Sequence, residues 1–176
     1  MKNQPLPLFC MVFIFITLAL SVFAHENNES PRTIDTTKEC PLCGMIPARY
    51  PLFHCQIVFM DGSYEAFDSA IGLLVYLFFP EKTERSSKTV QSIYFKDYIA
   101  ETWIEAKETI FVVGSEVLGP MGVEFLPVNS EETAQKLSQL EKGKEIIRFE
   151  RIDRNYLIRA AKKEWLHVLA SDLVLH

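Results

Sequence analysis

The chain has 176 residues, a length that suits one domain or two small subdomains sharing a core. Its apolar content of 48% and charged content of 23% are ordinary for a globular protein. The formal net charge is −5 and no block of Lys and Arg occurs, so nucleic-acid binding, which needs clustered positive charge, is not expected.

The first 24 residues have the pattern of a signal peptide. Lys2 precedes an apolar stretch over residues 6–23, and Val22-Phe23-Ala24 is an acceptable signal-peptidase site. The alternative is an uncleaved membrane anchor, because the apolar stretch approaches the length that spans a bilayer. A lipid-attachment cysteine would follow such a stretch, whereas Cys10 lies near its start. In either case we expect a periplasmic or otherwise extracytoplasmic domain.

Residues 25–38 are polar and contain Pro31, which predicts a flexible tether, with folded structure beginning near Glu39. Because Cys10 would leave with the signal peptide, the mature chain keeps Cys40, Cys43 and Cys55. An odd number of cysteines cannot all pair within one chain. At least one thiol is therefore free, blocked or metal-bound.

The pattern after the first cysteines predicts two strands, a helix and a further strand. Asp61-Gly62 is a strong two-residue hairpin signal, Asp68-Ser69 offers a helix N-cap, and Pro80 ends the helix. We expect strands at 53–60, 63–67 and 93–98 and a helix at 70–79.

The second half repeats this order. Asn129-Ser130 offers a second N-cap, and its setting after Val128 resembles Phe67-Asp68-Ser69 in the first half. The expected elements of this second unit are strands at 110–113, 123–128 and 146–152, a turn-rich loop at 114–122, and a helix at 131–141, and a further strand is expected at 103–104 between the two units. The prediction is an α+β protein made of two mainly antiparallel ββαβ units over 39–152, with an extra amphipathic C-terminal helix over 153–176.

Cys40-x-x-Cys43 is the first candidate for chemistry, since a tight turn can bring two thiolates to one metal ion. A local disulfide and a thiol–disulfide redox pair are the alternatives. A redox pair of the thioredoxin type would begin a helix, but Gly44 and Pro47 oppose helical turns here. A structural zinc site would need further ligands, and His54 and Cys55, as neighbours on one strand, would point to opposite faces.

Two methionines favour a soft metal. Met45 places a thioether two residues after Cys43, and thiolate with thioether is a donor set that Cu(I) prefers. Met121 lies in the turn Gly119-Pro120-Met121-Gly122, from which it could complete the site or simply cover a hydrophobic patch.

At these motifs the sequence resembles the NosL family of copper-binding accessory proteins, which are linked to nitrous oxide reductase maturation. The resemblance covers about residues 39–150, and it rests on six short segments. They are Cys40-Pro41-Leu42-Cys43-Gly44-Met45, Phe59-Met60-Asp61-Gly62 with Phe67-Asp68, Tyr94-Phe95-Lys96-Asp97-Tyr98, Trp103-Ile104-Glu105-Ala106 and Gly119-Pro120-Met121-Gly122.

The resemblance implies an exported Cu(I) metallochaperone with a duplicated ββαβ fold. It would deliver copper to a periplasmic copper enzyme or a membrane assembly complex, and no enzymatic activity is expected. Cys43, Met45 and Met121 match the family's metal motifs, and Cys40 matches the first cysteine of the pair, as ligand or as partner of another cysteine. The alternative function is a thiol–disulfide oxidoreductase that uses Cys40 and Cys43. The sequence indicates no particular oligomeric state.

Overall fold

The computed structural model describes residues 30–81, 83 and 87–160. The chain divides into two units, Met1–Ser30 and Pro31–His176, and only Ser30 of the first unit is described. The predicted signal peptide therefore lies outside the described residues. Within the part that the structure describes, none of the helices combines the length and the hydropathy needed to cross a bilayer.

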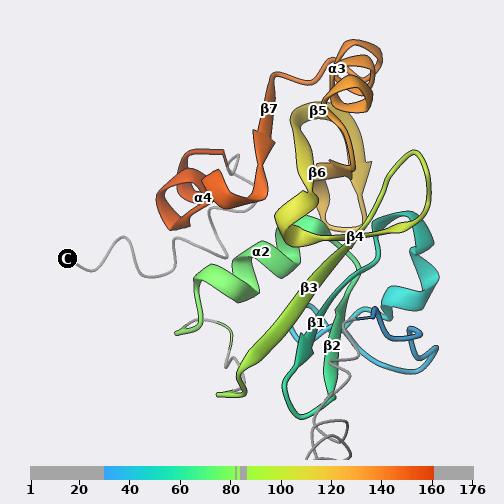
Figure 1. Cartoon of the computed structure of the whole chain (residues 1–176), viewed down its shortest axis with the longest axis vertical. Coiled ribbons are helices and arrows are strands. Elements are labelled where there is room, and N and C mark those ends of the chain that lie inside the picture. The colour runs from blue at the N-terminus through green and yellow to red at the C-terminus, as the bar shows by residue number, and fades with distance from the viewer. Residues whose placement is uncertain (1–29, 82, 84–86, 161–176) are drawn as a thin grey trace, which may run out of the picture. The chain divides into compact units, whose positions relative to one another are not determined.

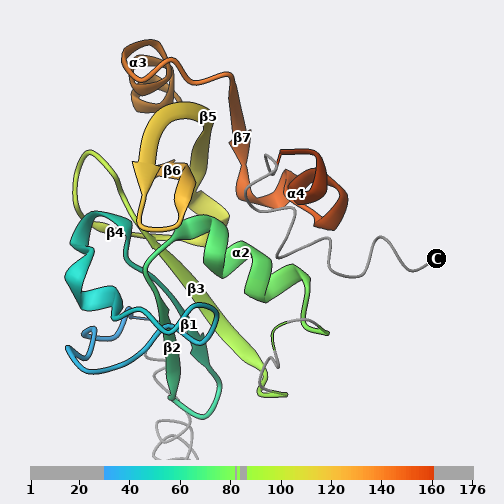
Figure 2. The same ribbon diagram turned by 180° about the vertical axis from the view of Figure 1, so that it is seen from behind.

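The first half of the fold is a four-stranded antiparallel sheet with one helix (Figures 1 and 2). The strand order is β2-β1-β3-β4, and a hairpin at Asp61-Gly62 joins β1 to β2 as predicted. Gly62 has a φ of +81°, which a residue with a side chain rarely adopts. The elements are β1 (Cys55–Phe59), β2 (Tyr64–Phe67), α2 (Ala70–Phe78), β3 (Val90–Lys96) and β4 (Trp103–Glu105).

The second half repeats ββαβ as a three-stranded antiparallel sheet in the order β6-β5-β7. Its elements are β5 (Ile110–Gly119), β6 (Gly122–Val128), α3 (Glu131–Leu140) and β7 (Glu145–Arg148). Helix α4 (Arg154–Ala160) follows, and the rest of the predicted C-terminal helix lies outside the described residues. The α+β class and the two ββαβ units are thus confirmed.

The two helices that complete the units begin in the same way. The hydroxyl of Ser69 accepts a hydrogen bond from Gly72 N at 3.2 Å, and that of Ser130 accepts one from Thr133 N at 3.2 Å. Each serine has an extended backbone and satisfies an amide of the first helical turn. The two segments that resemble each other in sequence, before α2 and before α3, therefore also share the same capping geometry.

Two predicted boundaries in the second unit are wrong. Residues 114–122 were expected to be a loop, but β5 continues to Gly119, with a register shift between Val113 and Leu118. Gly114 has a φ of +74° within that irregularity, so here a glycine marks a bulge and not the end of the strand. The last strand, expected over 146–152, ends at Arg148 because Phe149–Arg151 forms a 3-10 turn.

Aromatic side chains join the two sheets within the main hydrophobic core. Phe95 on β3 and Phe111 on β5 are fully buried, with ring centroids 5.0 Å apart in an edge-to-face arrangement. Phe125 on β6 packs against Phe111 with centroids 6.1 Å apart. Helix α2 contacts β1 and β2 of its own sheet and β6 of the other sheet. The helix is therefore common to both halves of the molecule.

Polar contacts also cross between the halves. The buried carboxylate of Asp97, which follows β3, accepts a hydrogen bond at 3.0 Å from Asn129 N, just before α3. Its other oxygen accepts bonds from Ile99 N and Ala100 N. Tyr98 N donates to Pro127 O on β6 at 2.8 Å.

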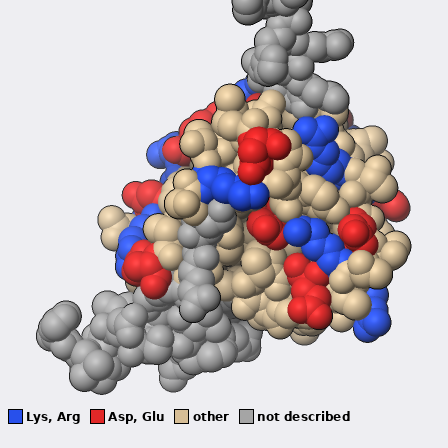
Figure 3. All heavy atoms as spheres, turned by 90° about the horizontal axis from the view of Figure 1, so that it is seen from below, with Lys and Arg blue, Asp and Glu red and all other residues tan. Residues whose placement is uncertain are grey.

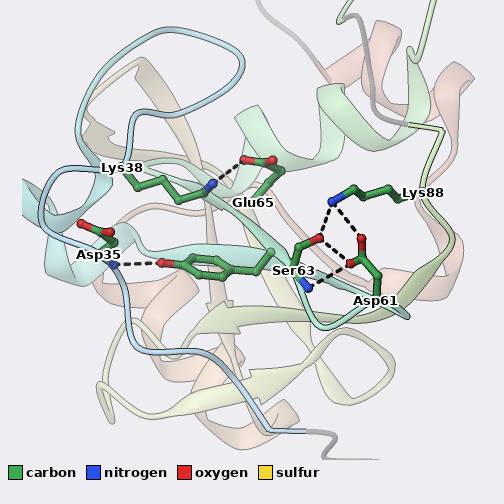
Figure 4. Close-up of polar contacts among 7 residues, drawn as sticks. Asp35, Lys38, Asp61, Ser63, Glu65 and Lys88 are labelled. Carbon is green, nitrogen blue, oxygen red and sulfur yellow. Dashed lines mark hydrogen bonds and ion pairs between the residues drawn. The ribbon is translucent and has the colours of Figure 1, made fainter.

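Part of the predicted tether is bound to the first sheet. Gln56 on β1 is fully buried, and its side-chain amide accepts from Arg32 N at 2.7 Å and donates to Arg32 O at 3.0 Å. Asp35 N donates to the Tyr64 hydroxyl at 3.0 Å, and Lys38 forms an ion pair with Glu65 at 3.0 Å (Figure 4). The segment from Arg32 to Lys38 thus lies against the β1–β2 hairpin, ahead of the expected start near Glu39.

Charges of both signs are interspersed on the described part of the surface in Figure 3. Lys88, just before β3, forms an ion pair at 2.9 Å with Asp61 on the β1–β2 hairpin. This face shows no basic patch of the kind that nucleic acids require.

Candidate metal centre

The segment between Cys40 and Met45 folds into a closed loop. Cys40 N donates to Met45 O at 2.7 Å, and Gly44 N donates to Cys40 O at 2.9 Å. Gly44 has a φ of +75°, a conformation in which a side chain would be strained. No helix begins at this cysteine pair, which distinguishes the loop from a thioredoxin-type motif.

The loop lies on the first turn of α2. The space beside Gly72 is occupied by Leu42, so that a Cβ added at Gly72 would lie 3.5 Å from Leu42 Cδ2. Cys40 is 3% exposed and belongs to the main hydrophobic core, while Cys43 is half-buried and packs against that core. The Cys40 thiol is therefore buried in the interior, whereas the Cys43 thiol is partly accessible to solvent.

A carboxylate joins the two thiols. The side-chain ligand atoms of Cys40, Cys43 and Asp68 all lie within 4.8 Å of one another. The Cys43 thiol donates a hydrogen bond to Asp68 Oδ1 at 3.3 Å. Asp68 is 1% exposed, and its Oδ2 has no hydrogen-bond partner among the described residues. A buried, unpartnered carboxylate oxygen beside two sulfurs fits a site that receives a cation.

The two cysteines differ in acidity. A hydrogen bond from the Cys40 thiol to the Cys43 sulfur lowers the pKa of Cys43, and the same bond, together with burial, raises the pKa of Cys40. The backbone amide of Met45 also stabilises the Cys43 thiolate and lowers its pKa, whereas the charge of Asp68 opposes this by raising it. Cys43 is thus the thiol that more readily becomes a metal-binding thiolate.

The two predicted methionines lie in different parts of the fold. Met45 is half-buried in the same loop as the cysteines. Met121 is half-buried in the β5–β6 turn and packs against the hydrophobic core that contains Cys40 and contacts Cys43. The structure brings Cys40 and Cys43 together, and the complete donor set of Cys43, Met45, Met121 and Cys40 stays a prediction.

Asp68 is the member of the cluster that sequence reasoning missed. Its position before a helix suggested an N-cap, but Ser69 performs the capping and leaves the Asp68 carboxylate for the cysteines. The sequence did contain one signal for Asp68, since it belongs to the Phe67-Asp68 segment on which the family resemblance rests.

Cys55 and His54 do not belong to the cluster. The fully buried Cys55 thiol donates to Ser69 O at 3.1 Å, and burial raises its pKa well above the ordinary value. A ring nitrogen of His54 lies 2.7 Å from Pro47 O, and burial lowers the pKa of this histidine. Cys40, Cys43 and Cys55 are all free thiols.

Comparisons with known proteins identify the family of this chain. The family model described as NosL matches residues 31–157. The copper-binding lipoprotein NosL of Stutzerimonas stutzeri is 28% identical over 147 residues, which cover 79% of this chain and 74% of the relative. The crystal structure of the copper chaperone NosL from Shewanella denitrificans is similar with a TM-score of 0.61 and 26% identity, covering 72% of this chain and 98% of that one. The chain therefore belongs to the NosL family.

Proposed function

We propose that this protein binds Cu(I) outside the cytoplasm and passes it to a copper-accepting protein. The observation that carries the proposal is the cluster of Cys40, Cys43 and Asp68, in which a partly buried thiol of lowered pKa lies beside a buried carboxylate. Support also comes from relatives that are described as a copper-binding lipoprotein and a copper chaperone.

The donor types favour Cu(I) over harder ions. Thiolate and thioether sulfurs are soft ligands that select Cu(I), whereas carboxylate and water alone suit Mg²⁺ or Ca²⁺. We place Cys43 at the centre of the site, with Met45 and Met121 as thioether ligands. Cys40 is either a further ligand or a hydrogen-bond donor to Cys43. In the metal-free protein Asp68 orients the Cys43 sulfur by accepting the hydrogen bond from its thiol, and that bond is lost when Cu(I) replaces the proton.

Binding and release would follow from ligand exchange. When Cu(I) binds, it replaces the proton on the Cys43 sulfur, and that proton leaves to solvent. Cu(I) is satisfied by roughly two or three soft donors, so an incoming sulfur or imidazole of a partner can bind before a sulfur of this chain leaves. Because Cys43 is only partly buried, the partner can reach its sulfur.

The recipient we propose is a periplasmic copper enzyme or its membrane assembly complex, with nitrous oxide reductase as the specific client. Export by the predicted signal peptide, or retention by an uncleaved membrane tether, would place the protein in the same compartment. The role is that of a carrier, and the proposal assigns no catalytic residue.

Competition with a Cu(I)-selective chelator tests the binding step. The reduced protein should withdraw one equivalent of Cu(I) from the chelator, and failure to compete would remove the proposal. Cys43→Ala should weaken binding most, with smaller losses for Met45→Ala and Met121→Ala. Cys55→Ala is the matched control, because it removes a free thiol that lies outside the cluster and should leave the affinity unchanged.

A thiol–disulfide oxidoreductase is the second candidate, because the Cys40 and Cys43 sulfurs lie within 4.8 Å and the pKa of Cys43 is lowered. An insulin-reduction assay separates the two functions. A copper carrier should not reduce insulin above the background rate, and its Cu(I) binding should depend on Met45 and Met121. An oxidoreductase should reduce insulin and should keep this activity when both methionines are replaced.

A further inference from the structure

Glu124 is a buried carboxylate that links the two halves of the molecule. It lies on β6 of the second sheet, is 1% exposed, and its Oε1 accepts hydrogen bonds from Ile71 N at 3.0 Å and Phe125 N at 2.9 Å. Ile71 is in the first turn of α2, where amides lack partners within the helix. A side chain of the second unit thus satisfies the helix that follows Asp68 in the first unit.

The other oxygen of Glu124 faces the turn that carries Met121. A Cβ added at Gly119 would lie only 2.7 Å from Glu124 Oε2 and 3.3 Å from its Cγ. Gly119 pairs with Gly122 at the end of the β5–β6 hairpin, so Pro120 and Met121 form the turn between them. Glycine at 119 allows the base of this turn to close directly over the Glu124 carboxylate.

The Glu124 side chain therefore lies between the helix that follows Asp68 and the turn that carries Met121. On one side it holds the first turn of α2, on which Leu42 of the cysteine loop packs and which Asp68 precedes. On the other side it supports the turn that presents Met121 to the core. Among the described residues the Oε2 atom of Glu124 has no hydrogen-bond partner.

We propose that Glu124 is a positioning residue that holds Met121 in register with the cysteine loop, so that sulfurs from both halves can bind one Cu(I). The inference rests on the proposed function. In this account Glu124 does not contact the metal. It acts by fixing the distance between the Gly119–Gly122 turn and the N-terminus of α2.

A simpler alternative is that Glu124 only stabilises the fold as a buried helix cap. The alternatives differ in what happens to Met121. A stabilising residue can be removed with a loss of folding free energy while the folded fraction binds Cu(I) as before. Removal of a positioning residue, in contrast, weakens Cu(I) binding by the folded protein. Met121 then no longer reaches the metal, so a further Met121→Ala substitution has no effect on the affinity.

The experiment is a mutational cycle on the full chain, read by Cu(I) competition and by X-ray absorption at the copper edge. Glu124→Ala should weaken Cu(I) binding by about 10–100-fold, the range seen when residues behind metal ligands are lost. Glu124→Gln, which keeps an oxygen for Ile71 N and Phe125 N, should restore most of the affinity. Met121→Ala should have no further effect in the Glu124→Ala background, whereas Cys43→Ala should keep its full effect there.

Gly119→Ala provides a second route that leaves Glu124 in place. The new Cβ must displace the carboxylate or the turn, so the affinity should fall as in Glu124→Ala, and the copper should show one sulfur neighbour fewer. The effect of Gly119→Ala should disappear when Glu124 is already Ala. Asp97→Asn is the matched control, because it alters a buried carboxylate that binds the backbone before α3 and should leave Cu(I) affinity unchanged.

The outcomes are distinguishable. If the wild-type protein does not compete for Cu(I), the proposed function fails. If the wild type binds but folded Glu124→Ala and Gly119→Ala bind equally tightly with the same sulfur count, the positioning role fails alone. An unchanged effect of Met121→Ala in the Glu124→Ala background would also overturn it. Should Glu124→Ala not fold, Gly119→Ala decides between these outcomes.

Discussion

The Cys43 sulfur lies 3.3 Å from Oδ1 of Asp68, although the two residues are 25 positions apart in the sequence. The contact exists because the cysteine loop folds onto the first turn of α2, which Asp68 immediately precedes. A thiol that donates a hydrogen bond to a carboxylate has a raised pKa. Asp68 therefore opposes deprotonation of Cys43 in the metal-free protein.

Asp68→Asn should make Cys43 more reactive. The Cys40 hydrogen bond lowers the pKa of Cys43, and the charge of Asp68 and its hydrogen bond from the thiol oppose that lowering. Removing the charge lets the Cys43 pKa fall further, so we expect alkylation by iodoacetamide near neutral pH to accelerate roughly threefold to tenfold.

Mass spectrometry of the metal-free protein would locate the modified cysteine. Buried Cys40 and Cys55 should stay unmodified in the folded protein. Asp97→Asn serves as the control, and its alkylation rate should equal that of the wild type. Slower modification of Cys43 in Asp68→Asn would contradict the role assigned to the carboxylate.

Glu124 should make the protein less stable as the pH rises toward neutrality. Burial raises the pKa of Glu124 to about 7 in the folded protein, from 4.5 in the unfolded chain. Between these values the unfolded chain loses the proton while the folded protein keeps it, so the free energy of unfolding falls with increasing pH. The loss is complete above about pH 7 and amounts to about 3 kcal/mol at most.

Urea unfolding of the wild type and Glu124→Gln at several pH values isolates this contribution, because the glutamine does not titrate. The difference in unfolding free energy between the two proteins should change between pH 4.5 and 7 and be constant above that interval. A difference that stays constant throughout would mean that the folded carboxyl titrates like the unfolded one.

Gln56→Ala should release the segment that contains Arg32. The fully buried Gln56 amide makes two hydrogen bonds to the backbone of Arg32, and their loss should cost about 1–3 kcal/mol of unfolding free energy. Trypsin should then cut after Arg32 and Lys38 faster than in the wild type. Tyr64→Phe, which removes only the exposed bond from Asp35 N, should change stability by less than about 0.5 kcal/mol.

Local signals predicted the repeated elements of this fold. The Asp61-Gly62 hairpin and the serine caps of α2 and α3 are decided within a few residues by turn and helix-end chemistry. The extension of β5 to Gly119 was missed because glycines in a strand and glycines in a loop look alike until the partner strand is known.

The sequence predicted the cysteines of the candidate centre. It did not predict the carboxylates of Asp68 and Glu124 that lie in or beside that centre. Cys40 and Cys43 come together through a loop closed by its own backbone, which spacing alone can indicate. Asp68 and Glu124 gain their roles from contacts with residues 25 and 53 positions away, and no local pattern records such pairings. Binding of Arg32 by Gln56 was missed for the same reason.

The most direct test of the central claim is copper-edge X-ray absorption on the reduced protein loaded with one equivalent of Cu(I). We expect a copper site dominated by roughly two or three sulfur neighbours, which is lost in Cys43→Ala and loses one sulfur in Met121→Ala. A site made only of nitrogen and oxygen neighbours, or a spectrum unchanged by Cys43→Ala, would contradict the claim.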